Sequence, residues 1–155
     1  MVLHVVNGPN LNLVGRREPD IYGARPLDGY LDELAAGLAA AGDGVTLERF
    51  QSNHEGELVD YLQSVGFRQN TGVILNAGAL GHTSLALGDC VRAIRVPVVD
   101  VHISNVYARE AFRQNSYVAP AAAGTIAGFG LAGYRLAAEW LAGELARRAA
   151  AGATG

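Results

Sequence analysis

Short runs of apolar, β-branched residues alternate along this chain with longer segments whose apolar residues recur every three or four positions. The short runs predict strands over residues 2–6, 45–50, 73–75, 96–101 and 125–127. The other segments have one apolar face and predict helices around residues 31–39, 58–65, 87–94 and 134–145. Strands and helices that alternate in this way are typical of a parallel sheet with helices on both faces.

Five strands in a chain of 155 residues predict an α/β fold, a flavodoxin-like doubly wound five-stranded parallel sheet with three layers. We expect one catalytic domain over residues 1–148, followed by a frayed tail of small residues over 149–155. Ligands of such sheets bind beyond the carboxyl ends of the strands, where the strand order reverses. The site is therefore expected in the loops at residues 7–23, 51–55, 76–84, 102–116 and 128–133.

Composition excludes several partners and one kind of chemistry. A net charge of -3 leaves no basic surplus for a phosphate backbone, so we expect no nucleic-acid partner. No apolar run approaches the roughly 20 residues that span a bilayer, and no cleavable leader is visible, which predicts a cytoplasmic protein without membrane contact. All 12 cationic residues are arginines. A lysine Schiff base is therefore excluded, and carbonyl chemistry must use general acid–base catalysis and electrostatic stabilisation.

The loop after the first strand, residues 7–23, is longer than an ordinary strand-to-helix connection. It is either a solvated surface loop or a substrate lid in which Arg17 and Tyr22 face the ligand. In the second case the nearby cation favours the ionised form of the tyrosine.

The fourth strand ends in Asp100 and His102, whose side chains share one face of the strand because they are two residues apart. Asp100 can therefore orient or polarise His102, although an Asp-x-His pair alone is weak evidence for catalysis. Arg109 and Arg113 follow at a spacing of four, which predicts one side of a short helix and two guanidinium groups suited to a carboxylate. Such a pair is otherwise typical of a solvated face.

Small residues after the third strand, from Asn76 to Ser84, let the backbone approach a ligand before the next helix begins. His82 is either a ligand contact or a polar loop residue, and Thr83 or Ser84 is expected to cap the helix. Because His82, His102 and Asp100 lack a recognised metal-ligand spacing, we expect no metal. Residues 52–55 predict a capping box at the second helix, and Cys90, the only cysteine, is expected to be a buried, inert thiol.

Several blocks of residues, taken in order, resemble the type II 3-dehydroquinate dehydratases from Val2 to about Leu141. The matching blocks are residues 7–12, 15–19, 22–23, 51–56, 76–78, 82–84, 101–105, 109–110, 112–113 and 116–117. The resemblance implies a hydro-lyase of the shikimate pathway or of quinate breakdown, which forms 3-dehydroshikimate through an enolate, without an imine, a cofactor or a metal. It also implies a flavodoxin-like fold. The absence of lysine agrees with this chemistry independently.

By the same resemblance, Tyr22 is the base that takes the proton beside the ketone, and Arg17 supports its ionisation and stabilises the developing charge. His102 is the acid that protonates the departing hydroxyl, and Asp100 orients it. The resemblance also implies residues that bind substrate or brace the site: Asn10, Asn76, His82, Asp89, Ile103, Ser104, Arg109 and Arg113. Asp89 matches a position that reaches a neighbouring subunit, in a family whose trimers assemble into dodecamers.

The chain departs from the family pattern in its acid half. Asp100 stands where the family usually has Glu, Gly81 replaces a common Ser or Thr, and two common histidines are replaced by Tyr107 and Asn115. Asp100 and Gly81 motivate one alternative, an inactive or repurposed small-molecule-binding protein on the same scaffold. A flavodoxin-like nucleotide or flavin module is a second alternative, against which the lack of a hydroxyl-rich phosphate loop after Val6 counts.

Overall fold

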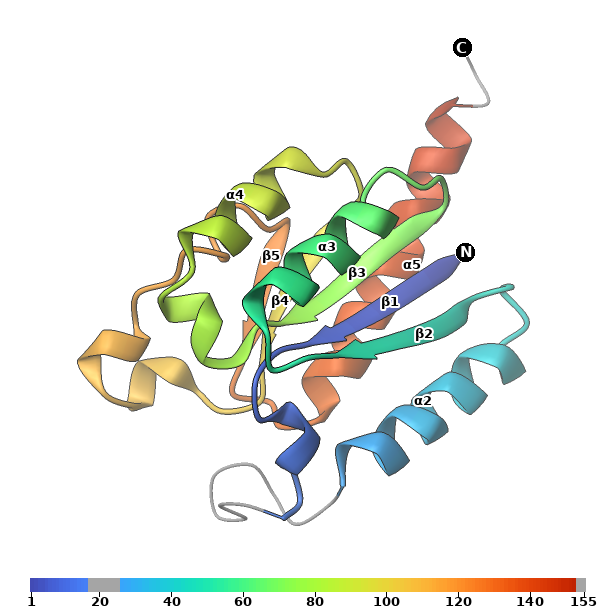
Figure 1. The fold of residues 1–155 in the computed structure, drawn as a ribbon. Coiled ribbons are helices and arrows are strands. Elements are labelled where there is room, and N and C mark those ends of the chain that lie inside the picture. The colour runs from blue at the N-terminus through green and yellow to red at the C-terminus, as the bar shows by residue number, and fades with distance from the viewer. Residues whose placement is uncertain (17–25, 153–155) are drawn as a thin grey trace.

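The computed structural model describes residues 1–16 and 26–152, and these form one five-stranded parallel sheet with helices packed on it (Figure 1). The strands are β1 (Val2–Asn7), β2 (Thr46–Gln51), β3 (Thr71–Asn76), β4 (Val98–His102) and β5 (Gly124–Ala127). The four α-helices of the described residues are α2 (Leu27–Ala40), α3 (Glu55–Val65), α4 (Leu85–Ala93) and α5 (Ala132–Gly152). The predicted flavodoxin-like α/β fold is confirmed.

The sheet has the order β2-β1-β3-β4-β5, and every neighbouring pair of strands is parallel. The strand order reverses between β1 and β3, where Asn7 and Asn76 are paired at the two carboxyl ends. Ligands of open α/β sheets bind at such a reversal. The fold therefore places the loops after β1 and β3 side by side, at the edge where we expect the site.

Two apolar clusters, one on each face of the sheet, make the three layers. On one face, α2 and α5 contribute Leu31 and Leu141 to a cluster with Leu3 of β1. On the other face, α3 and α4 contribute Leu62 and Leu87. The central strands β1, β3 and β4 are almost wholly buried, as is typical of strands covered on both faces, whereas the edge strand β2 is largely exposed.

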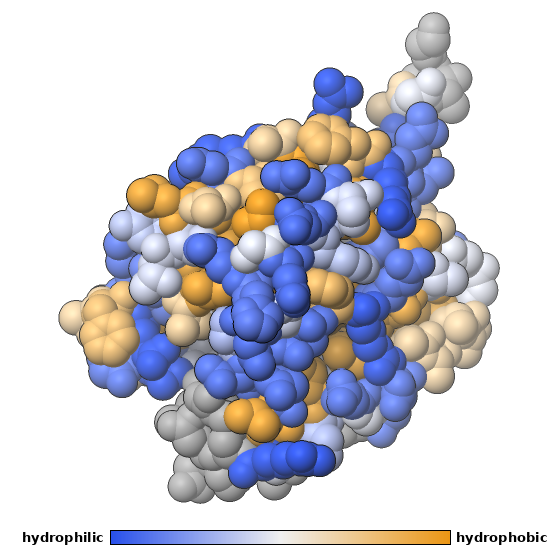
Figure 2. Space-filling view, in the orientation of Figure 1, coloured by the Kyte–Doolittle hydropathy of each residue, from blue (hydrophilic) through white to orange (hydrophobic). Residues whose placement is uncertain are grey.

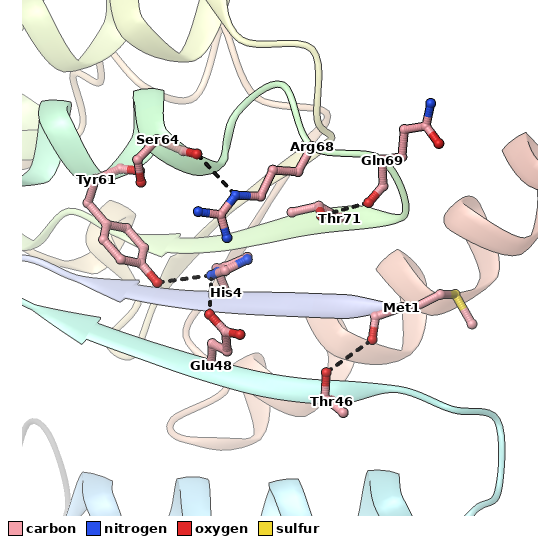
Figure 3. A network of polar contacts seen from close by, with 9 residues as sticks. All are labelled: Met1, His4, Thr46, Glu48, Tyr61, Ser64, Arg68, Gln69 and Thr71. Carbon is pink, nitrogen blue, oxygen red and sulfur yellow. Dashed lines mark hydrogen bonds and ion pairs between the residues drawn. The ribbon is translucent and has the colours of Figure 1, made fainter.

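Hydrophilic side chains cover the middle of the face on which α3 and β2 lie (Figure 2). Beneath this face, the buried His4 of β1 contacts the hydroxyl of Tyr61 at 2.9 Å and the carboxylate of Glu48 at 3.5 Å (Figure 3). The ring of Tyr61 also stacks on Phe50 at 4.1 Å between centroids. This group lies on α3, β1 and β2, and none of its side chains lines the cavity described below.

Three local predictions need correction. Residues 52–55 do not form a capping box, because Ser52 accepts a bond from the backbone N–H of His54 and donates to Glu57, while His54 is the N-cap without a side-chain bond. The arginines at 109 and 113 do not share one short helix. Residues 149–152, expected in the tail, continue α5, since alanine favours helix more than any other residue. Ser84, by contrast, caps α4 as expected and accepts from Leu87 N–H at 2.9 Å.

Candidate active site

A cavity of about 170 Å³ opens at the carboxyl edge of the sheet, where the loops after β1, β3 and β4 converge. It contains eight of the residues singled out from the sequence as site residues: Asn10, Asn76, His82, His102, Ile103, Ser104, Arg109 and Arg113. Because these residues come from three loops that are distant in the sequence, the parallel sheet is what gathers them.

His102, which lines the cavity, forms a buried pair with Asp100. Nε2 of His102 lies 3.0 Å from Oδ2 of Asp100, and the two side chains are 7% and 0% exposed. His102 lines the cavity, and Asp100 lies beneath it on the same face of β4. The other oxygen of Asp100, Oδ1, has no hydrogen-bonding partner among the described residues. With Nε2 held by the carboxylate, Nδ1 is the ring nitrogen left to exchange a proton with a ligand.

His82 stacks on His102 with ring centroids 5.7 Å apart and 21° between the planes. Its Nδ1 lies 2.7 Å from the backbone oxygen of Asn115. A carbonyl oxygen only accepts hydrogen bonds, so Nδ1 carries a proton and donates it. At Gly81, an added Cβ would lie 3.8 Å from Cε1 of His102, an ordinary contact distance. A side chain at this position would thus touch the ring, and glycine leaves that side of it open.

Two arginines form the cationic side of the cavity. Arg109 follows the 3₁₀ helix η3 (Val106–Ala108), and Arg113 ends η4 (Ala111–Arg113), so they lie on separate short elements. The predicted single helix is wrong because Arg109 has an extended backbone, with φ -106° and ψ -166°. Both guanidinium groups nevertheless line the cavity.

Glu110, between these arginines, joins them. Its Oε2 lies 2.9 Å from Nε of Arg113 and 3.7 Å from Nε of Arg109. The bond from its own backbone N–H lowers the pKa of Glu110 most, and the bond from Arg113 lowers it further. Arg109 also donates to Oγ of Ser104 at 3.3 Å. An exposed carboxylate therefore orients both guanidinium groups, a role that the sequence did not reveal because any surface glutamate has the same signature.

Asn10, which lines the cavity, has a left-handed backbone with φ 67°, and its N–H donates to Oδ1 of Asn53 at 2.9 Å. Asparagine tolerates this conformation better than most residues. Ile103 lies directly after β4, and its carbonyl oxygen accepts from Gly130 N–H at 3.0 Å. That bond ties the loop after β5 to the cavity wall.

Asn76, at the end of β3, is 3% exposed and donates from Nδ2 to the hydroxyl of Tyr134 at 2.8 Å. The tyrosine in turn donates to Oδ1 of Asn7 at 2.8 Å. Sequence reasoning assigned Tyr134 only to the apolar face of the last helix. The sequence did contain a signal for this role. The helical periodicity predicts that Tyr134 is buried, and a buried tyrosine oxygen needs a hydrogen-bonding partner.

The structure does not place three of the predicted site residues in this group. Asp89 lies on α4, is 74% exposed, does not line the cavity and pairs with Arg92 at 2.9 Å. Arg17 and Tyr22 lie outside the described residues. Cys90 is buried as expected, and burial raises the pKa of its thiol.

Within residues 1–16 and 26–152, no group of three or more His, Cys, Asp or Glu side chains is arranged to hold a metal ion. No helix of this described part is long and apolar enough to cross a membrane. The cavity combines an imidazole backed by a carboxylate, two guanidinium groups, hydroxyl and amide groups. These groups suit a small, anionic, hydroxylated ligand on which a proton is transferred.

Comparison with known proteins gives a consistent result. The sequence model of the family described as Dehydroquinase class II matches residues 1–142. A 3-dehydroquinate dehydratase of Roseiflexus castenholzii is 51% identical over 146 residues, which cover 92% of this chain and 89% of that protein. The 3-dehydroquinate dehydratase 1 of Agrobacterium fabrum is 52% identical over 136 residues, covering 88% of this chain and 92% of that protein. The crystal structure of a type II dehydroquinase from Butyrivibrio crossotus matches with a TM-score of 0.83 and 38% identity, over 91% of this chain and 97% of that chain.

Proposed function

Since the chain belongs to the class II dehydroquinase family, whose reaction is the dehydration of 3-dehydroquinate, we propose that it carries out this reaction as an enolate-type elimination by the residues named above. The enzyme is a hydro-lyase that forms 3-dehydroshikimate. In the first step a base removes a proton from the carbon beside the ketone, and the electron pair of that bond forms the enolate. In the second step the enolate re-forms the ketone, a carbon–carbon double bond appears, and the hydroxyl group leaves as water.

Tyr22 is the base of the first step, and Arg17 stabilises its phenolate and the enolate oxygen. Both assignments depend on the family likeness of residues 15–19 and 22–23, which include residues outside the described part of the chain. The absence of lysine supports an enolate in place of an imine, because no amine side chain is present to attack the ketone.

His102 protonates the departing hydroxyl in the second step. Two observations support this role: His102 lines the cavity, and Nε2 is held at 3.0 Å by a fully buried carboxylate. Asp100 fixes the ring so that Nδ1 faces the substrate, and its negative charge stabilises the imidazolium form that donates the proton. A single proton passes from His102 to the hydroxyl, which leaves as water.

The remaining lining residues bind the substrate. Arg113 takes the carboxylate or a hydroxyl group, helped by Ser104 and the backbone at Ile103, because guanidinium and hydroxyl groups match these oxygens. Arg109 braces this side through its bond to Ser104. Asn10, Asn76 and His82 contact the ring hydroxyl groups from the opposite loops.

Assembly and setting follow from the same likeness. Asp89 reaches the site of a neighbouring subunit, within trimers that assemble into a dodecamer. Its high exposure and its absence from the cavity of its own subunit support this placement. The enzyme acts in the cytoplasm, in aromatic amino-acid biosynthesis or in quinate breakdown, without a resident cofactor or metal.

The observation that carries the mechanism is the buried His102–Asp100 pair at the wall of a cavity with two arginines. The test is to add 3-dehydroquinate to the purified chain and to follow the enone absorbance of the product. We expect this absorbance to increase with the wild type. His102→Ala should lower the rate of increase by about a hundredfold or more. Substrate binding without turnover would instead support the repurposed binding protein that Asp100 and Gly81 motivate.

A further inference from the structure

Behind the cavity, Asn7, Tyr134 and Asn76 form a buried chain of hydrogen bonds that connects three elements. Asn7 and Asn76 end β1 and β3, and Tyr134 lies in the first turn of α5. Both hydrogen bonds to the tyrosine oxygen are 2.8 Å long. Asn7 is 4% exposed, Tyr134 is 0% exposed and Asn76 is 3% exposed. This chain of hydrogen bonds therefore lies at the reversal of the strand order and is almost wholly buried.

The direction of each bond follows from one backbone group. Gly78 N–H lies 3.2 Å from the Asn76 side chain and can only donate, so the atom facing it is the oxygen Oδ1. The amide group of Asn76 must then present Nδ2 to Tyr134, whose oxygen accepts. The single hydroxyl proton is left for Oδ1 of Asn7. Each donor has one acceptor, and the reverse orientation of the Asn76 amide would set two donors, Nδ2 and the Gly78 N–H, against each other.

Among the described residues, Asn76 is thereby left with one Nδ2 hydrogen that has no hydrogen-bonding partner. Its oxygen faces Gly78, and its first Nδ2 hydrogen is donated to Tyr134. Since Asn76 lines the cavity, the second hydrogen is a fixed donor available to a bound ligand. Without the tyrosine oxygen, Nδ2 would lose its partner in this chain of bonds, and the longer 3.2 Å bond from Gly78 N–H to Oδ1 would be left to orient the amide.

We propose that Tyr134 is a positioning residue for substrate binding, which locks the Asn76 amide so that it presents a hydrogen-bond donor to an oxygen of the substrate. This inference rests on the proposed role of Asn76 as a substrate-binding residue. Tyr134 itself lines no part of the cavity, so it acts entirely through Asn76.

Two further observations support a rigid, permanent lock. Burial raises the pKa of Tyr134 far above its ordinary value, so the hydroxyl keeps its proton at neutral pH. The loops on either side are also pressed together, because Gly8 N–H donates to the Asn76 carbonyl at 2.8 Å, and a Cβ at Gly8 would lie only 2.4 Å from the Ala77 oxygen. The backbone is thus fixed independently, and the tyrosine controls only the amide.

The test is Tyr134→Phe, which keeps the ring in the core and removes the oxygen. We expect KM for 3-dehydroquinate to rise about 3- to 10-fold, the effect of one misplaced neutral hydrogen bond, with kcat within about twofold of the wild type. Tyr61→Phe is the matched control. It also removes a tyrosine oxygen bonded to a buried side chain, His4, but away from the cavity (Figure 3). Both variants should unfold at lower temperature, and only Tyr134→Phe should change KM.

A double-mutant cycle separates positioning from a general loss of stability. In an Asn76→Ala background there is no amide to orient, so Tyr134→Phe should add nothing to KM although it still lowers the unfolding temperature. An unchanged KM in Tyr134→Phe, or a KM effect that adds fully to that of Asn76→Ala, overturns the inference. The wild type tests the function separately, because absence of turnover there would refute the dehydration itself.

If Tyr134→Phe does not fold, as judged by circular dichroism, Asn7→Ala takes its place in the same cycle. This change removes the acceptor of the hydroxyl proton, which then competes for the Asn76 amide and disturbs its orientation. The same rise in KM is expected in the wild-type background and the same lack of effect in the Asn76→Ala background. A wild-type KM in Asn7→Ala would overturn the inference equally.

Discussion

At residue scale, Asp100→Asn keeps the shape of a fully buried side chain and removes the charge that faces His102. We expect kcat to fall about tenfold or more, because an acid that must form imidazolium loses its counter-charge, while KM changes by no more than about twofold. Steady-state kinetics on 3-dehydroquinate measure both parameters. Asp60→Asn, the same exchange at an exposed position of α3, is the control and should match the wild type. A wild-type kcat in Asp100→Asn would mean that something else orients His102.

The base of the reaction gives a second prediction. Tyr22→Phe and Arg17→Ala should each reduce kcat by roughly a hundredfold or more and leave the circular dichroism spectrum intact, because each removes a group that we propose forms the enolate. Tyr107→Phe is the matched control, since Tyr107 is 65% exposed and does not line the cavity. Near-normal turnover in either variant removes that residue from the mechanism.

The residues that sequence alone could identify are those whose position at a strand end already fixes their direction. Asp100 and His102 share a face because they are two apart on a strand, and the structure joins them at 3.0 Å. Glu110 and Tyr134 escaped because their roles depend on partners far away in the fold or on loop geometry. No periodicity tells a glutamate that orients two arginines from a solvated one.

At the scale of elements, the cluster that joins β1, β2 and α3 is expected to make stability depend on pH. Burial lowers the pKa of His4 below its ordinary 6.5, Glu48 opposes this shift, and Arg68 adds to it. Tyr61 supplies the contact from α3 (Figure 3). The folded chain thus keeps His4 neutral at a pH where the unfolded chain has protonated it.

The sign follows from proton binding. Below pH 6.5 the unfolded state binds more protons at this position, so the free energy of unfolding falls as pH falls, with a slope of at most about 1.4 kcal/mol per pH unit from this group. Urea unfolding of the wild type and of His4→Gln between pH 7.5 and roughly pH 5 measures the difference, and the variant should show the flatter dependence. His54→Gln, at the exposed N-cap of α3, is the control. Equal slopes in the wild type and His4→Gln would refute the expectation.

The elements themselves were predicted well where burial dictates periodicity and poorly where local hydrogen bonds compete. All five predicted strands are present, because runs of β-branched residues favour strands. The capping box failed because Ser52 bonds to Glu57 in place of the expected residue. The helix expected across both arginines failed because the loop breaks into two 3₁₀ turns, a choice that spacing alone does not encode.

At the scale of the whole molecule, the site depends on strand order more than on any motif. The strand order reverses between β1 and β3. This reversal pairs Asn7 with Asn76, although the two residues lie 69 positions apart in the sequence. Sequence reasoning located the correct edge of the sheet, since parallel strands must end together. It did not supply the contacts between loops, because these depend on how α5 packs Tyr134 against both strands.

Asp89 lies on α4, where its side chain is 74% exposed and contacts Arg92 of the same helix. If Asp89 completes the site of a neighbouring subunit, sedimentation should detect trimers or multiples of them, and Asp89→Ala should lower kcat/KM by about tenfold, the effect of one lost charged hydrogen bond. Asp60→Ala, also exposed but on α3, should have no effect. A folded and fully active monomer would contradict the proposal.

Mixing two inactive or weakened variants gives a sharper test of whether the aspartate acts across subunits. A His102→Ala subunit has a dead site but carries Asp89, whereas an Asp89→Ala subunit has an intact His102 but lacks the aspartate for its neighbour. When the two are unfolded together and refolded, mixed trimers contain sites that combine His102 of one subunit with Asp89 of the next. Activity should therefore exceed the average of the two variants refolded separately. If Asp89 acted within its own subunit, no such site would form, and the mixture would give that average and no more.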